Sequence, residues 1–437
     1  MKAEDSGTSA KNAGLVLSDR DRAGITRKKV ETPSEEEGGS PTISWDYLLP
    51  NGKKMSDGDR IESLNSLAVP PAWTEVWFCP DENGHIQATG KDSNERLQYR
   101  YHPKWNKYKS RLKYQNVDEF AAELNSLRFE ISQDLGSKGM NKDKVVALVI
   151  WLIDRYHIRV GSDQYAQENK SYGLTTLKES HIEYIRKNAI EDGLRVLKQN
   201  KDPLPKINVM MKFTGKSGKD WKLYIRHPEI AKLIEESAKV GGKDKEQDLF
   251  RYLDENGNDY DIKAEHINDY LDEKMDNRYT AKDFRTWAAS WKTAARLAMV
   301  SDASQKEISD LPGAHQKSLE RSKRDGFPPY LEWRGRYLKG TEGLAKLAES
   351  GKLPGEGEKD RMATMLAVID TVAADLGNTR AVCRSSYIRP MFIDDWGEGV
   401  FLERWNEAKK GPIRGEEMLP DETTAINYMK DWEYQEF

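Results

Sequence analysis

Short apolar stretches alternate with turn signals near the N-terminal end of the chain. Glu75-Val76-Trp77-Phe78-Cys79 and His85-Ile86-Gln87-Ala88-Thr89 flank the turn residues Pro80-Asp81-Glu82-Asn83-Gly84. Two such stretches around a turn are typical of a β-hairpin. We therefore expect residues 43–116 to form a small β-rich N-terminal domain.

From residue 117 onward the apolar spacing becomes helical. Apolar side chains recur at steps of three or four, at Phe120, Leu124, Leu127, Ile131 and Leu135. This spacing places them on one face of an α-helix. We expect residues 117–390 to form a larger, mainly α domain, which makes the fold class α+β.

A second alternating stretch interrupts the helical pattern at residues 206–225. Apolar residues alternate on both sides of Gly215-Lys216-Ser217-Gly218-Lys219, a run that favours a turn. The pattern predicts a second hairpin with Lys216 at its tip.

Three segments differ from this plan in composition. Residues 1–42 have little apolar periodicity and predict a disordered leader. Residues 300–361 are rich in Gly, Pro and charge, and predict a partly helical surface insertion. Residues 391–437 form an acidic tail, which we expect either to pack as a helix on the catalytic domain or to compete with DNA for a basic surface.

Charge is distributed unevenly along the chain. The net charge is −4, which by itself argues against a nucleic-acid partner. The acidic tail, however, holds twelve acidic and five basic residues. Residues 89–115, the basic stripe, hold eight basic and two acidic residues. This stripe restores nucleic acid as a candidate partner.

The sequence excludes several other classes of protein. No apolar run approaches the length of about 18 residues that a membrane span needs, and no signal peptide is recognisable, so we expect a cytoplasmic protein. Cys79 and Cys383 are far apart and lack His partners at ligand spacing, which supports neither a disulfide framework nor a zinc site.

The candidate nucleophile is Tyr387, in a segment that runs from Gly377 to Pro390. A phenol attacks phosphorus poorly at neutral pH unless cations surround the reacting centre. Arginine binds phosphate oxygens through two donors and stays charged, while lysine can give up a proton. Arg159, Lys216 and Arg285 are the candidate cations.

Their local motifs resemble those of the type IB DNA topoisomerases, in particular the small bacterial and poxvirus kind. The resemblance covers about residues 43–300 and 362–390. The blocks that carry it are Ser66–Trp77, Tyr99-Arg100-Tyr101-His102-Pro103, His157-Ile158-Arg159-Val160-Gly161 with Tyr172–Leu177, Phe213–Lys219, Ala281–Trp287 and Gly377–Pro390.

The resemblance implies a fold and a mechanism. A β-rich domain and an α-helical catalytic domain of the tyrosine recombinase and type IB topoisomerase kind would form a clamp around double-stranded DNA, as a monomer associated with the nucleoid. Tyr387 would attack the scissile phosphate, Arg159 and Arg285 would stabilise the phosphorane, and Lys216 would act as general acid, alone or with help from Arg159. Asn378 lies where the family has a histidine or asparagine that contacts a non-bridging oxygen.

No cofactor is implied. A phosphotyrosyl ester conserves the energy of the broken bond, so religation needs neither metal nor ATP. Gly215-Lys216-Ser217 lacks the first glycine of a phosphate-binding loop, because Met210 occupies that position. We therefore expect no nucleotide site.

The resemblance also implies DNA-contacting residues. Gln98, Tyr99, Arg100, Tyr101 and Lys104 lie in the basic stripe, and Tyr165 follows Arg159 by six positions. Alternation along a strand would place Tyr99 and Tyr101 on one face. The family's lysine three positions after the first arginine is Ser162 here, so a sequence preference is not implied.

Each candidate has a purely structural alternative. Arg159 and Arg285 would pair with Asp163 and Asp283, Lys216 would be a solvated hairpin tip, Tyr387 would be a core residue and Asn378 a helix cap. Sheet packing alone would account for Tyr99 and Tyr101.

Three rival functions remain open at this stage. A tyrosine recombinase shares the fold, the tyrosine and the arginines, but usually has a histidine where this chain has Lys282. A non-catalytic architectural DNA-binding protein and an RNA-processing enzyme are the other two.

Overall fold

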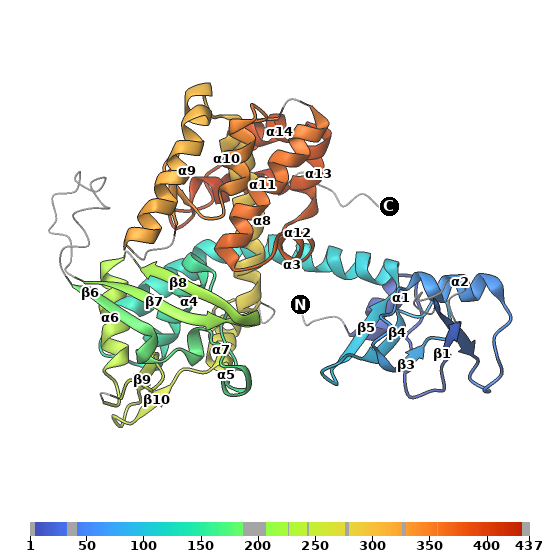
Figure 1. Ribbon diagram of the computed structural model, residues 1–437. Helices are drawn as coiled ribbons and strands as arrows, with labels where there is room; N and C mark the ends of the chain where they lie inside the picture. The colour runs from blue at the N-terminus through green and yellow to red at the C-terminus, as the bar shows by residue number, and fades with distance from the viewer. Residues whose placement is uncertain are drawn as a thin grey trace. The chain divides into compact units, whose positions relative to one another are not determined.

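A computed structural model of the 437-residue chain describes residues 5–32, 42–186, 207–225, 227–242, 244–275, 279–325, 329–355 and 357–430. The chain divides into two compact units, Lys2–Gln115 and Asn116–Phe437 (Figure 1). The division falls within one continuous helix, α3 (Pro103–Gly136), which begins earlier than the apolar spacing predicted.

The first unit is built on two small antiparallel sheets. Strands β1 and β2 pair with each other, and β3, β4 and β5 form a three-stranded sheet in that order. The predicted hairpin corresponds to β3 and β4. The elements are α1 (Ser6–Asn12), β1 (Thr26–Thr32), β2 (Thr42–Leu48), α2 (Gly58–Ser66), β3 (Thr74–Phe78), β4 (Ile86–Lys91) and β5 (Leu97–Tyr101).

The expectation of a disordered leader is wrong for residues 5–32. Asp5 caps α1, Ala10 and Leu15 are buried with Trp105, and Ile25 enters the core of the unit beside Phe78. These apolar residues are too widely spaced to show a helical or strand periodicity. Each nevertheless packs against apolar residues that come later in the chain. Residues 33–41 lie outside the described part of the chain.

The second unit is mainly helical, with a three-stranded antiparallel sheet in the order β6-β7-β8. The predicted second hairpin corresponds to β7 and β8, and a short 3-10 turn, η4 (Lys216–Gly218), joins them. The elements up to α8 are α4 (Lys142–Tyr156), α5 (Asp163–Asn169), η1 (Leu174–Thr176), η2 (Glu179–His181), β6 (Ile182–Arg186), β7 (Ile207–Gly215), β8 (Lys219–Ile225), α6 (Pro228–Ala238), β9 (Arg251–Leu253), β10 (Asp259–Asp261), α7 (Ala264–Lys274) and α8 (Ala281–Ser301).

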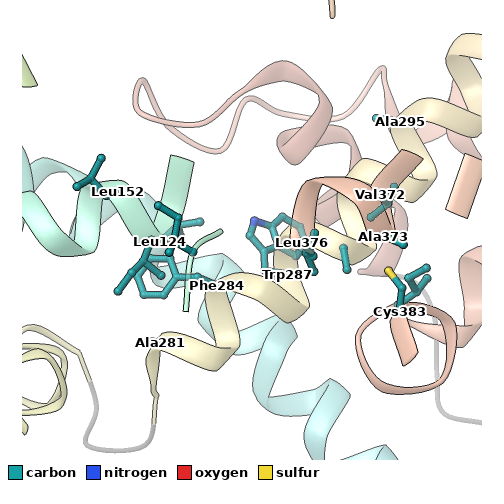
Figure 2. Packing of buried hydrophobic residues seen from close by; sticks show 14 of the residues in the cluster. Leu124, Leu152, Ala281, Phe284, Trp287, Ala295, Val372, Ala373, Leu376 and Cys383 are labelled. Carbon is teal, nitrogen blue, oxygen red and sulfur yellow. The ribbon is translucent and has the colours of Figure 1, made fainter. Parts of the chain in front are cut away.

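Helix α8 runs through the core of the second unit. Most of its 21 residues are buried, and it contacts α4, α11, α13 and α15. Figure 2 shows Phe284 and Trp287 among apolar side chains that come from α3, α4, α11 and α12. Because α8 is covered on several sides, residues on its first turns are held rigidly.

The segment at residues 300–361 is only partly a surface insertion. It contains α9 (Gln305–Asp325), β11 (Leu331–Trp333), β12 (Arg336–Leu338) and α10 (Glu342–Glu349). Leu311, Leu331, Leu338 and Leu344 join the main hydrophobic core. Gly335 and Gly351 lie in turns between its elements, whereas Pro312 and Gly313 lie within α9.

The acidic tail packs on the second unit over its described residues. It forms α13 (Pro390–Glu398), α14 (Phe401–Ala408) and α15 (Pro420–Met429), after α11 (Glu358–Leu376) and α12 (Arg380–Ser386). Phe392, Trp396, Trp405 and Tyr428 belong to the main core. Packing on the catalytic domain is therefore confirmed for this part of the tail.

A buried ion network ties the tail to the helices before it. Arg128 of α3 donates to Asp154 of α4 at 2.8 Å and to Glu422 of α15 at 2.7 Å, and all three side chains are almost fully buried. Trp287 of α8 donates to Glu422 at 3.0 Å. The network therefore connects four helices, α3, α4, α8 and α15.

We predict that Arg128→Met destabilises the protein by about 3–5 kcal/mol, because Glu422 would then be buried without its cation and Asp154 would keep only Arg155, at 3.8 Å. Urea denaturation measures the free energy of unfolding. Lys346→Met is the control, because Lys346 forms an exposed pair with Glu342, and its free energy of unfolding should stay near that of the parent. Equal effects of the two substitutions would contradict the prediction.

Candidate active site

Arg159 follows the end of α4, where His157 adopts a left-handed conformation with φ 58°. The chain then runs beside residues 173–175. Leu174 N donates to Arg159 O at 2.9 Å, and Thr175 N donates to Val160 O at 2.7 Å. A Cβ on Gly173 would lie 2.5 Å from Gly161 N, so the close approach requires glycine. Two motifs that are separated in sequence therefore form one support for Arg159.

Lys216 is exposed at the start of the turn between β7 and β8. The turn needs left-handed residues, which are Ser217 at φ 64° and Gly218 at φ 69°. Lys219, at the other end of the turn, donates to the carbonyl oxygen of Asn378 at 2.9 Å. The hairpin is thus anchored beside Lys216.

Arg285 lies in the first turns of α8 and is only 3% exposed. Its guanidinium donates to the carbonyl oxygens of His157, at the end of α4, and Leu376, at the end of α11. Burial and then the charge of Arg159 lower the pKa of Arg285 to about 10. The group stays protonated at neutral pH, and both of these hydrogen bonds engage carbonyls and not carboxylates.

Tyr387 ends α12 and is partly buried. Ser290 of α8 donates to Tyr387 O at 3.2 Å and accepts from Arg389 N at 3.0 Å. The guanidinium carbon of Arg285 lies 5.5 Å from the centre of the tyrosine ring. Burial alone would raise the pKa of Tyr387, but the charges of Arg285 and Arg159 outweigh it, and the pKa is lowered. A lowered pKa favours the phenolate.

Asn378 follows Gly377, which ends α11 in a left-handed conformation with φ 63°. Asn378 Oδ1 accepts a hydrogen bond from Arg159 Nη2 at 2.7 Å. Its Nδ2 is buried and has no hydrogen-bond partner within the described residues. Gly377 is the cap of α11, and only the backbone N of Asn378 bonds back to that helix, at Ala373 O (2.9 Å), while the Asn378 side chain contacts a catalytic candidate.

Four of the five predicted catalytic residues line one cleft of about 350 Å³. The side chains are Arg159, Lys216, Arg285 and Tyr387, and the cleft also includes Tyr165, Tyr172 and Lys282. Asn378 lies behind this lining, bonded to Arg159. The cleft therefore brings together the predicted nucleophile and the three predicted cations.

The alternative in which the arginines pair with neighbouring carboxylates is not what the structure has. Asp163 pairs with Lys263 at 3.3 Å, while Arg159 bonds to Asn378. Asp283 accepts hydrogen bonds from Thr280 and Asn116, while Arg285 turns inward. Residues that are close in sequence point in different directions here. Proximity along the chain therefore did not predict the hydrogen-bond partners of Arg159 and Arg285.

Two family models match the chain. The model of the catalytic core of eukaryotic DNA topoisomerase I matches residues 102–387, and the model of the N-terminal domain of bacterial DNA topoisomerase IB matches residues 44–92. The first match covers more than half of the chain. The chain belongs to the type IB DNA topoisomerase family. The resemblance that the motifs indicated is confirmed.

Three curated relatives of this family are similar in sequence. DNA topoisomerase 1B of Acanthamoeba polyphaga mimivirus is 32% identical over 56% of this chain and 66% of its own length. DNA topoisomerase 1 of Mycosarcoma maydis is 23% identical over 41% of this chain and 17% of its own length. DNA topoisomerase 1 beta of Arabidopsis thaliana is 27% identical over 41% and 16%. The chain spans only part of the length of these relatives.

The predicted DNA-contacting residues of this type IB family member differ in exposure. Tyr99 and Tyr101 are exposed on one face of β5 and stack with ring centres 5.7 Å apart. Lys104 is exposed. Arg100 lies over the Trp73 ring at 5.2 Å and bonds to Ala68 O, and Gln98 bonds to Asp92 at 2.9 Å. Tyr165 is 47% exposed in the cleft of the second unit.

Sequence reasoning missed the residues that hold the catalytic candidates in this type IB topoisomerase fold. His157 and Leu376 act through their carbonyls, which no side-chain pattern predicts. Ser290 lies five positions after Arg285, and Lys219 three after Lys216. Among these supporting residues, only Gly377 could be recognised from the sequence, because a glycine directly after an apolar helix is typical of a helix end.

Among the described residues, no cluster of three or more His, Cys, Asp or Glu side chains is arranged to hold a metal ion. No described helix combines the length and the apolar character needed to cross a membrane.

We predict that Gly377→Ala destabilises the protein more than Gly351→Ala. Both glycines have φ near +65°, so each substitution carries a strain of about 1–2 kcal/mol. A Cβ on Gly377 would also lie 2.3 Å from the Trp221 ring, whereas one on Gly351 would meet open space. Urea denaturation of both variants measures the difference. Equal destabilisation of the two variants would show that the Trp221 ring can move away from the added Cβ without a loss of stability.

Proposed function

We propose that this chain is a DNA topoisomerase of type IB that relaxes positive and negative supercoils. It cuts one strand through a 3′-phosphotyrosyl intermediate, allows the duplex to rotate about the intact strand, and religates the cut. The observation that carries this proposal is the shared cleft of Arg159, Lys216, Arg285 and Tyr387. Family membership supports it.

In the proposed cleavage step, Oη of Tyr387 attacks the scissile phosphorus and the bond to the 5′ oxygen breaks. The lowered pKa of Tyr387 favours loss of its proton. Lys216 donates a proton to the leaving 5′ oxygen, a role that suits an exposed lysine on an anchored turn. Religation is the reverse reaction, in which the 5′ hydroxyl attacks the phosphotyrosyl bond.

Arg159 and Arg285 stabilise the negative charge of the phosphorane in this proposal. Arg285 is suited to this role because carbonyl dipoles orient its guanidinium without cancelling its charge. Asn378 orients Arg159 through Oδ1 and keeps Nδ2 for a non-bridging oxygen. Preformed donors of this kind need little reorganisation as charge develops.

DNA binding in this proposal uses the exposed members of the basic stripe together with the cleft. Stacked Tyr99 and Tyr101 with Lys104 offer aromatic and cationic contacts to double-stranded DNA. The exchange of one phosphodiester for another conserves its free energy, so the proposed cycle uses neither ATP nor metal. We expect a monomer that acts at the nucleoid.

We predict that the intact protein relaxes negatively supercoiled plasmid in EDTA without ATP, and that detergent traps a covalent adduct on the 3′ end. Tyr387→Phe should form no adduct, because it lacks the attacking oxygen. Tyr165→Phe is the matched control, since Tyr165 lines the same cleft, and should still form the adduct. Tight DNA binding by the intact protein with neither relaxation nor adduct would favour an architectural role. An adduct that rejoins to a different strand would favour a recombinase.

We predict that Lys216→Ala slows cleavage by about 10²–10⁴-fold, the usual contribution of a general acid. A substrate with sulfur in place of the bridging 5′ oxygen should restore most of the rate, because a thiol loses its proton near pH 8.5 and leaves without protonation. Arg159→Ala is the comparison variant, and the sulfur-containing substrate should not restore its rate of cleavage. Failure of sulfur to restore Lys216→Ala would exclude a general-acid role.

A further inference from the structure

Lys216, the proposed general acid, has no side-chain partner of its own in the described part of the chain. It is the first residue of the η4 turn, is exposed, and forms no hydrogen bond or ion pair with a described residue. The backbone of the turn therefore sets where its amine lies. Any contact that holds this turn against the rest of the site also places the proposed proton donor.

The turn has a conformation that its own residues do not favour. Ser217 is left-handed at φ 64°, which is unfavourable for a residue with a Cβ and persists where surrounding contacts fix it. Main-chain pairing of Gly215 with Lys219 closes the turn. Because that pair lies within the hairpin, it does not fix the turn relative to the other candidates.

Lys219 makes a contact that does so. Its Nζ donates to the carbonyl oxygen of Asn378 at 2.9 Å. The side chain of the same asparagine accepts a hydrogen bond from Arg159 Nη2 at 2.7 Å. A single residue beyond the end of α11 therefore connects the turn that carries Lys216 with the guanidinium of Arg159.

Trp221 supports the same contact from two positions further along β8. Alternation along the strand places Trp221 and Lys219 on one face. The Trp221 ring stacks on Phe213 with ring centres 5.8 Å apart. A Cβ on Gly215 would lie 2.8 Å from this ring and one on Gly377 2.3 Å from it. Trp221 therefore packs the strands against the end of α11, and Lys219 extends this attachment to the turn.

We propose that Lys219 is a positioning residue for the general acid. Its bond to the Asn378 carbonyl holds the turn so that Lys216 Nζ reaches the leaving 5′ oxygen. Lys219 does not line the cleft, and in this role it transfers no proton. The inference rests on the proposed topoisomerase function and on the general-acid role of Lys216.

The test compares Lys219→Met, which removes the donor and keeps an unbranched stem, with Lys219→Arg, which keeps a donor. Lys222→Met is the matched control, because Lys222 is an exposed lysine of the same strand. The rate of tyrosine-adduct formation is measured with protein in excess, on DNA with either oxygen or sulfur at the bridging 5′ position. DNA affinity is measured in the Tyr387→Phe background, where cleavage is blocked.

We expect Lys219→Met to cleave ordinary DNA about tenfold more slowly, which is less than the about 10²-fold that a misplacement of about 1 Å can cost. The sulfur-containing substrate should restore its rate to near that of the parent, because a thiolate leaves without a proton from Lys216. Lys219→Arg and Lys222→Met should stay near the parent rate on both substrates. DNA affinity should be unchanged in all three variants.

A double variant gives an independent readout. If Lys219 acts only by placing the amine of Lys216, its removal has no effect once that amine is absent. The variant that carries both Lys216→Ala and Lys219→Met should therefore cleave ordinary DNA as slowly as Lys216→Ala alone. Multiplied effects of the two substitutions would show that the residues act independently and would overturn the inference.

Three further results would also overturn it. The first is a parent rate for Lys219→Met on ordinary DNA. The second is slow cleavage that sulfur does not restore, which would mean that Lys219 acts on Asn378 and Arg159 instead. The third is a loss of DNA affinity, which would make Lys219 a phosphate contact. If Lys219→Met loses the parent's cooperative thermal transition, Lys219→Ala replaces it under the same criteria.

Failure of the inference is distinguishable from failure of the proposed function. A parent protein that forms no tyrosine-dependent adduct would refute the function itself. A Lys216→Ala variant that sulfur does not restore would refute the general-acid role, and the inference with it. If the adduct forms and sulfur restores Lys216→Ala but not Lys219→Met, the inference alone is wrong.

Discussion

The buried guanidinium of Arg285 is the constraint on which the rest of the second unit depends. A charge that is 3% exposed must be hydrogen-bonded, yet a carboxylate partner would cancel the charge that the proposed contact with phosphate needs. Carbonyl oxygens of His157 and Leu376 resolve this conflict, because they bond to the cation without neutralising it. The ends of α4 and α11 must therefore converge on α8.

That convergence explains features that otherwise look unrelated. His157 and Gly377 both adopt left-handed conformations, which end the two helices with their last carbonyls near Arg285. The helices after Tyr387 cover α8, and Glu422 fixes Trp287 two positions beyond the arginine. Arg128 is likewise buried with more than one partner, since it pairs with Asp154 and Glu422. Rigidity of this kind is what a preorganised phosphate site requires.

Much of the fold was predictable from the sequence. The elements predicted best were those whose pattern depends only on residues close together in the chain. Apolar spacing predicted the helical second unit, and alternation predicted the β7–β8 hairpin with Lys216 at its turn. Residues 5–32 were misjudged, because their few apolar side chains pack on residues much later in the chain, such as Phe78 of β3 and Trp105 of α3. The tail's negative charge likewise concealed the aromatic residues that make it part of the core.

For the site, the sequence by itself determined which chemical groups are present: a phenol, two guanidiniums, an amine and an amide, each in a recognisable local motif. Tertiary structure alone decided their partners. Arg159 bonds to Asn378 and not to nearby Asp163, although the asparagine is 219 positions away. The physical reason is that hydrogen bonds, burial and pKa depend on distances in space, and residues far apart in the chain supply the atoms that set them. The motifs identify which chemical groups are present, but the packing of the helices fixes the charge, orientation and separation of these groups.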